Sequence, residues 1–261
     1  MLSMIDRVKM KRATNAATGD VQVFLERLLI EVVAANYRHF LTEKIELLND
    51  GNSNADFSCW PPLFANERQV SGIFASALNT MCPSTIPEHK IQRRLERNED
   101  SDELTGTSGR VDFLSYFGRR SIGLELKGAS ISTTAGGDYV VLKNLWDKVV
   151  AQSKEAHTYM RQKECRADYP DGTGVGLMVI RVTRQARKFT EMSTFQNELS
   201  RHAESISQTV EDVKKKLKPD FLAQYIPPNE MQAILKKNSY KIFPCILFAA
   251  TVHGKADSLL T

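Results

Sequence analysis

Three charged residues near the middle of the chain have the types and spacing needed to do chemistry together. Glu125 and Lys127 alternate with apolar residues in the run Ser121–Gly128, so in an extended strand both charged side chains point to one face. They would lie about 6.6 to 6.8 Å apart along that strand, at ~3.3 to 3.4 Å per residue. Asp112 lies in the preceding run, Arg110–Phe117, which is joined by a short link that suits an antiparallel hairpin. Asp112 is therefore expected close to Glu125.

Two carboxylates beside a lysine suit a divalent metal ion and phosphate chemistry. Mg²⁺ takes hard oxygen ligands, usually one or two carboxylates with waters and phosphate oxygens. Asp112 and Glu125 could supply the carboxylates, and the backbone carbonyl of Leu126 could be a third ligand. The ion would lower the pKa of a water molecule, and Lys127 would position that water or stabilise the developing negative charge. We predict a magnesium site in which Mn²⁺ could substitute; the alternative is an exposed sheet face with an ordinary salt bridge.

An acid-x-lysine triplet has little meaning by itself, because the chain contains two others. Glu88–Lys90 is expected ahead of a strand, with no earlier strand to supply a second carboxylate, and Asp212–Lys214 falls in a polar helix. Only the triplet at Glu125 lies in an apolar alternating strand with a hairpin partner that carries Asp112. We therefore place the candidate centre there.

Helices and strands alternate along the segments that must position this centre. Apolar residues at helical spacing predict five helices, of which the last is the shortest. They are Asp20–Leu48, Asn66–Met81, Leu142–Lys163, Thr194–Leu217 and Asn229–Lys237. Apolar or alternating runs predict strands: His89–Glu96, Arg110–Phe117, Ser121–Gly128, Val175–Val182 and Lys241–Val252. The polar stretches Asn98–Gly109 and Ser130–Asp138 are expected to be loops.

This order of elements predicts an α/β fold with a central mixed sheet flanked by helices. Residues 1–65 would form an N-terminal helical extension packed on the core. Residues 66–190 would form the core, and residues 191–261 would add helices and a final strand that complete the domain. The long helices at both ends could be docking surfaces for a partner, or they could pack against the core.

The sequence resembles the PD-(D/E)XK nuclease superfamily. The resemblance rests on GRVDF (Gly109–Phe113), on LELK (Leu124–Lys127) and on the order helix, three strands, helix, strand. It implies a restriction-endonuclease-like αβββαβ core. Val111 stands where the proline of the family name would be. No QxxxY spacing is present, which speaks against the exonuclease branch.

The resemblance also implies two accessory residues. Glu67, near the start of the first core helix, matches an acidic residue that often completes the metal site. Gln152, on the second core helix, matches a catalytic glutamine of some members. Each has a plainer interpretation: Glu67 as a favourable acid in a first helical turn, and Gln152 as an amide on a helix surface.

The activity that the resemblance implies is metal-dependent hydrolysis of phosphodiester bonds. DNA is the more expected substrate than RNA and endonucleolytic cutting the more expected mode, with restriction or anti-phage defence as the setting. Arg110 and Lys154 are candidate phosphate contacts, or else solvated salt-bridge partners. A homodimer is expected if both strands are cut at a symmetric site. Two alternatives stay open: a non-catalytic nucleic-acid-binding module on the same fold, and a nuclease gated by a regulatory protein partner.

Composition narrows the class of protein only slightly. The 261 residues carry a formal net charge of +4, which weakly favours a polyanionic partner. Four scattered cysteines without zinc-ligand spacing predict reduced thiols in a cytoplasmic protein. No apolar run reaches the length of a membrane helix, and the five histidines show no HExxH pattern.

Overall fold

The computed structural model describes residues 8–11, 19–51, 59–65, 67–97, 104–133, 138–187, 197, 200, 203–236 and 239–254. Its helices are α2 (Gly19–Asn49), α4 (Glu67–Met81), α5 (Tyr139–Met160) and α7 (Ala203–Leu217), with 3-10 turns η1 (Pro62–Phe64) and η2 (Asn229–Met231). Its strands are β1 (Val8–Lys11), β2 (Ser84–Arg97), β3 (Leu104–Phe117), β4 (Arg120–Ser132), β5 (Thr173–Arg187), β6 (Phe221–Tyr225), β7 (Ala233–Lys236) and β8 (Ser239–His253).

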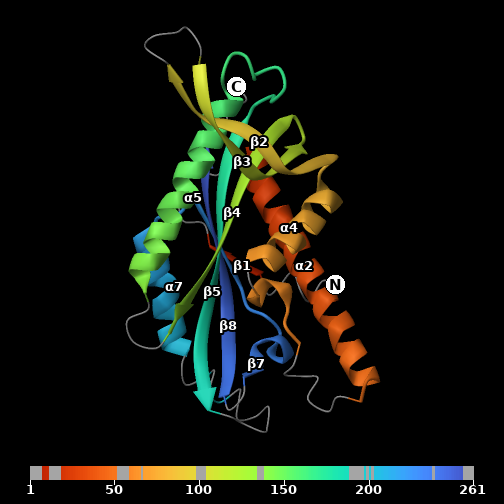
Figure 1. Cartoon of the computed structure of the whole chain (residues 1–261). Coiled ribbons are helices and arrows are strands. Elements are labelled where there is room, and N and C mark those ends of the chain that lie inside the picture. The colour runs from red at the N-terminus through yellow and green to blue at the C-terminus, as the bar shows by residue number, and fades with distance from the viewer. Residues whose placement is uncertain are drawn as a thin grey trace.

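An eight-stranded mixed sheet forms the centre of the molecule (Figure 1). The strand order is β1-β6-β8-β5-β4-β3-β2, and β7 pairs with β8 off this path. Strands β4 and β5 are parallel, whereas β2, β3 and β4 form an antiparallel series. The predicted α/β class with a mixed sheet is confirmed.

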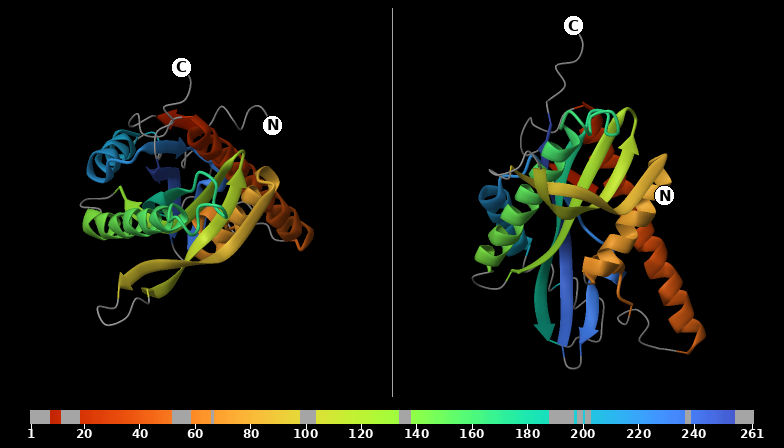
Figure 2. Two further views of the ribbon diagram at one scale, coloured as in Figure 1. Left: turned by 90° about the horizontal axis from the view of Figure 1, so that it is seen from above. Right: turned by 45° about the horizontal axis from the view of Figure 1, so that its top comes forward.

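Helices cover both faces of the sheet. Seen from above in Figure 2, α5 and α7 lie on the opposite side of the sheet from α2 and α4. Alternate residues of β4 serve the two sides: Leu124 and Leu126 pack with α2 and α4, whereas Ala129 and Ile131 pack with α5 and α7. This period-two division is what an apolar strand buried on both faces requires.

Helix α5 approaches β5 closely because two glycines there carry no side chain. A Cβ added at Gly174 would lie 2.0 Å from the backbone oxygen of Ser153. One added at Gly176 would lie 2.5 Å from Cγ1 of Val149. Gly176 pairs with Glu125 across the parallel β4–β5 ladder, so this close packing sets the position of α5 above the middle of β4.

Several sequence predictions need correction. The predicted helix Asn229–Lys237 is wrong: the chain forms η2 and then β7, which pairs with β8. The side chain of Gln232 holds this turn by donating a hydrogen bond to the Pro227 carbonyl at 2.6 Å. Pairing with a neighbouring strand thus outweighs a weak helical pattern. The pairing provides hydrogen-bond partners for the backbone N–H and C=O groups, and the local spacing of apolar residues carries no information about such a distant partner.

Strands also extend further than the sequence predicted. The expected loop Asn98–Gly109 is wrong in its second half, since β3 begins at Leu104 and pairs with β2. Similarly, β2 begins at Ser84 rather than His89, and β1 and β6 were not predicted. The last long helix was predicted to start at Thr194, which lies outside the described residues. In the described part of the chain, α7 begins at Ala203.

Among the described helices, none has the length and apolar character needed to cross a membrane. All four cysteines are free thiols, as predicted.

The close α5–β5 contact makes a testable prediction about stability. Gly174→Ala should lower the free energy of unfolding by about 1 to 3 kcal/mol or more, as overpacking does, because the new Cβ meets fixed backbone. Gly72→Ala is the matched control: no atom lies within 4 Å of its Cβ position, and replacing glycine inside helix α4 should stabilise by roughly 0.5 to 1 kcal/mol. Urea denaturation measures both, and a neutral Gly174→Ala would contradict the packing.

Candidate functional site

Asp112 and Glu125 lie on the adjoining strands β3 and β4, at the point where the β3–β4 ladder ends. The ladder runs from Phe117 opposite Arg120 to Phe113 opposite Leu124, so Asp112 and Glu125 are the next residues beyond its last pair. At this point Oδ2 of Asp112 accepts a hydrogen bond from the backbone N–H of Leu126 at 2.7 Å. The carboxylate is thereby fastened to β4 beside Glu125, whose side chain is only 1% exposed.

Lys127 lies two residues beyond Glu125 and reaches α4. Its Nζ is 3.3 Å from Oε1 of Glu67, and the two side chains are 23% and 49% exposed. Glu67 is the first residue of α4 and stands against β4, because a Cβ added at Gly128 would lie 4.0 Å from the Cα and Cβ of Glu67. The absence of a side chain at Gly128 therefore lets the helix start approach the strand that carries Lys127.

The electrostatic environment of Asp112 is unfavourable for its charge. Burial raises the pKa of the Asp112 carboxyl above its usual value, and the negative charges of Glu67 and Glu88 raise it further. The Leu126 N–H and the Lys127 ammonium oppose this shift. Burial is thus the main cause that disfavours the charged Asp112 carboxylate, and a bound cation would favour that charged form.

Glu88 is a site neighbour that sequence reasoning missed. We expected it ahead of its strand, but it lies inside β2, between Pro87 opposite Phe113 and His89 opposite Val111. It is therefore next to Asp112 on the adjoining strand. Its φ of 50° is in the left-handed region, which is uncommon for a residue other than glycine. The β-branched and apolar residues that precede it, Thr85 and Ile86, were the available signal for an earlier strand start.

Gln152 lies on the flank of α5 that faces β3. It precedes Ala156 by one turn, and Ala156 packs with Val111, the neighbour of Asp112. Oε1 of Gln152 is buried and has no hydrogen-bond partner among the described residues. A buried acceptor without a partner is costly, so this carbonyl oxygen is available to accept a hydrogen bond.

The two predicted phosphate contacts lie in different places. Arg110 forms an exposed ion pair with Glu88 at 3.5 Å, at the edge of the site. Lys154 is exposed on α5, and its charge acts on His253, whose pKa is lowered chiefly by burial. The structure thus brings Asp112 to the strand that carries Glu125 and Lys127, with Glu67 at Lys127, and Lys154 lies exposed on α5.

The donor set at Asp112 and Glu125 is compatible with a hard cation. Across the described ranges, no group of three or more His, Cys, Asp or Glu side chains is arranged to hold a metal ion. Glu67, expected as a further ligand, has its carboxylate at Lys127 instead. Two carboxylates nevertheless meet the requirement of Mg²⁺, which commonly keeps several waters.

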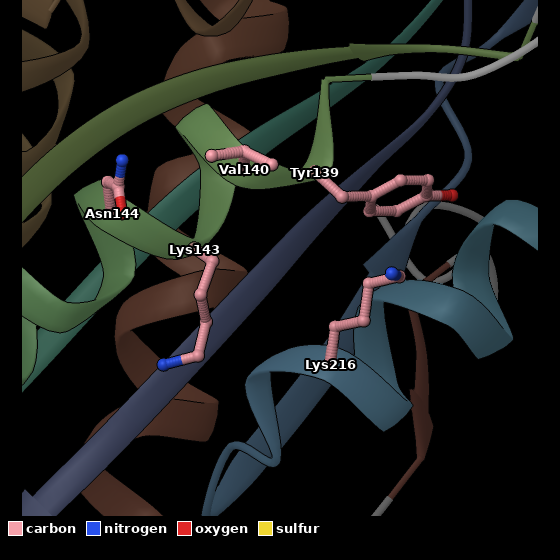
Figure 3. Close-up of a pocket in the computed structure, with 5 residues that line it drawn as sticks. All are labelled: Tyr139, Val140, Lys143, Asn144 and Lys216. Carbon is pink, nitrogen blue, oxygen red and sulfur yellow. The ribbon is translucent and has the colours of Figure 1, made fainter.

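A separate cavity of about 320 Å³ lies between the start of α5 and the end of α7. Its walls carry two lysines, an aromatic ring and an exposed valine (Figure 3): Tyr139, Val140, Lys143, Asn144 and Lys216. Nζ of Lys216 lies 4.7 Å from the centroid of the Tyr139 ring, so the ring already has a cation above it. Tyr139 is about 20 Å from Gln152 along α5, at ~1.5 Å per residue. The cavity is therefore no part of the site at Asp112.

Comparison with family models, curated proteins and solved structures finds no match for this chain. The geometry of the site is therefore the basis from which a function is inferred.

The raised pKa of Asp112 predicts how stability depends on pH. The folded state holds the Asp112 proton more tightly than the unfolded state, whose pKa is near 3.8. The free energy of unfolding therefore falls as the pH rises above that value. Asp112→Asn removes the charge and should raise the unfolding free energy at pH 7, and this gain should disappear as the pH is lowered to 3.8.

Urea denaturation at both pH values tests this prediction. Asp147→Asn serves as the control, because Asp147 is 57% exposed and pairs with Lys143 within one helix turn. That change should destabilise by no more than roughly 0.5 kcal/mol. An Asp112→Asn protein that is less stable than wild type at pH 7 would contradict the electrostatic account.

Proposed function

We propose that this protein is a metal-dependent nuclease that hydrolyses phosphodiester bonds at a PD-(D/E)XK-type centre. One observation carries the proposal: the Asp112 carboxylate accepts a hydrogen bond from the Leu126 amide at 2.7 Å, which ties it to β4 between Glu125 and Lys127. The chain order α4-β2-β3-β4-α5-β5, with β4 parallel to β5, is what a restriction-endonuclease-like αβββαβ core would have.

The carboxylates of Asp112 and Glu125 would hold the cation, with the carbonyl of Leu126 as the further predicted ligand. The chemistry that Mg²⁺ or Mn²⁺ supplies at such a site is Lewis acidity, which lowers the pKa of water and offsets phosphate charge. Burial of Glu125 and the sheet around it exclude bulk water from one side. Electrostatic interactions are strengthened where water is excluded.

Lys127 would supply the positive charge that the protein itself contributes. Its ammonium lies 3.3 Å from Oε1 of Glu67 and its side chain is 23% exposed, so Lys127 could also contact a phosphate oxygen or orient the attacking water. A preorganised cation of this kind stabilises negative charge as it develops. Gln152 adds a buried acceptor without a partner in the described part of the chain, suited to a hydrogen bond from that water or from the nucleotide.

DNA is the proposed substrate, cut endonucleolytically in a setting of restriction or anti-phage defence; this part rests on the family resemblance. Arg110 lies at the edge of the site with 59% of its side chain exposed, where it could exchange Glu88 for a phosphate. A net charge of +4 is consistent with a polyanionic partner.

Cleavage assays test the activity. Purified wild-type protein is expected to cut supercoiled plasmid with Mg²⁺ or Mn²⁺ and to be inactive with EDTA; labelled single-stranded DNA and RNA define the substrate class. Lys127→Ala and Glu125→Gln should each lower the rate by a factor of about 10² or more, the typical loss when a preorganised charge is removed. Lys148→Ala, an exposed lysine on α5, should leave the rate unchanged.

Two results would contradict the assignment. Full activity in a folded Glu125→Gln protein would show that Glu125 is not part of the catalytic centre, whichever substrate is cut. Absence of cleavage by wild type with either metal would remove autonomous nuclease activity. Fluorescence anisotropy with labelled DNA would then separate a binding module, which binds DNA alone, from a nuclease that needs a protein partner.

A further inference from the structure

Arg181 is a charged residue in the middle of an apolar strand. Its neighbours on β5, Ile180 and Val182, are completely buried, and Arg181 itself pairs with Ser130 of β4 and Ile246 of β8. The side chain is partly buried, and burial lowers the pKa of its guanidinium while the nearby Glu67 raises it. Placing a cation at such a position is costly unless its donors are used.

The guanidinium of Arg181 joins three segments of the chain. Its Nε donates a hydrogen bond to the carbonyl of Ala129 in β4 at 3.0 Å. Its Nη1 donates to the carbonyl of Ala65, just before α4. Its Nη2 lies 3.5 Å from the position of a Cβ added at Gly128. One planar group therefore connects β5, β4 and the entrance of α4.

The entrance of α4 is also where Glu67 begins the helix. Ala65 precedes Glu67 by two residues, so a bond that holds the Ala65 carbonyl restrains where the Glu67 side chain can stand. Glu67 in turn holds the Lys127 ammonium. Gly128 leaves room for both Glu67 and the guanidinium. The contacts form a continuous chain from Arg181 to Lys127.

We propose that Arg181 is a positioning residue: it holds the entrance of α4 against β4, so that Glu67 keeps the Lys127 ammonium beside Asp112 and Glu125. Its effect on cleavage rests on the proposed function, whereas its effect on α4 does not. Arginine suits the task because its rigid fork of donors can serve two carbonyls in different segments. A lysine offers a single compact ammonium group and would reach one of them.

The test uses three variants of the full chain. Arg181→Met keeps an unbranched stem and removes every donor, and Arg181→Lys keeps the charge. Arg184→Met is the matched control, because Arg184 lies on the same strand and its buried Nε has no partner within the described ranges. Hydrogen–deuterium exchange is measured over residues 67–72, with thermal unfolding to establish that each variant is folded.

We expect Arg181→Met to speed exchange in the first turns of α4 by about tenfold or more, corresponding to a loss of ~1.4 kcal/mol or more of local stability. Arg181→Lys should have a smaller effect in the same direction, and Arg184→Met none. Unchanged exchange at α4 in folded Arg181→Met and Arg181→Lys would overturn the proposal. This result does not depend on cleavage, so it separates a failed positioning role from a failed nuclease assignment.

Single-turnover cleavage supplies the functional readout. Arg181→Met should lower the cleavage rate by about 10- to 100-fold, as loss of a supporting residue does, with little change in KM for DNA. A Glu67→Gln, Arg181→Met double variant should be no slower than the slower single variant, because both changes disturb one chain of contacts. Multiplicative losses in the double variant would show that Arg181 acts independently of Glu67 and would overturn the positioning role.

Discussion

The hydrogen bond from the Leu126 amide to the Asp112 carboxylate is the contact on which the candidate site depends. It occurs just beyond the pair of Phe113 and Leu124, which is the last pair of the β3–β4 ladder counted from the hairpin turn. Beyond this pair, the Asp112 side chain accepts the hydrogen bond of the Leu126 backbone N–H. The bond holds the Asp112 carboxylate against β4, between Glu125 and Lys127, without neutralising it. A partly desolvated carboxylate is costly by itself, and this cost is the main physical reason to look for a cation there.

The surrounding fold supports this arrangement from both sides of the sheet. Gly174 and Gly176 let α5 settle close to β5, which brings Gln152 to the flank facing β3. On the other side, Gly128 and Arg181 bring the start of α4 to β4. Close approach of backbone segments therefore positions α5 and the start of α4 against the sheet. Such close packing tolerates little increase in side-chain volume.

The charges around Asp112 limit which functions are plausible. Burial raises the pKa of the Asp112 carboxyl, and the like charges of Glu67 and Glu88 add to this shift, although Glu67 pairs with Lys127 and Glu88 with Arg110. The left-handed backbone at Glu88 is a further local cost beside the same carboxylate. Costs of this kind concentrate at functional sites, and they favour a binding or catalytic centre over a plain sheet face.

Local sequence pattern by itself determined the face shared by Glu125 and Lys127, the hairpin with Asp112 and the α/β class. Each follows from period-two alternation and short turns, which neighbouring residues encode. Tertiary structure decided the strand at β7, the position of Glu88 beside Asp112, and the bridge that Arg181 makes to Ala129 and Ala65. These features depend on partners far away in the sequence, because a strand is defined by the neighbour it pairs with and a buried arginine by the carbonyls that its donors reach.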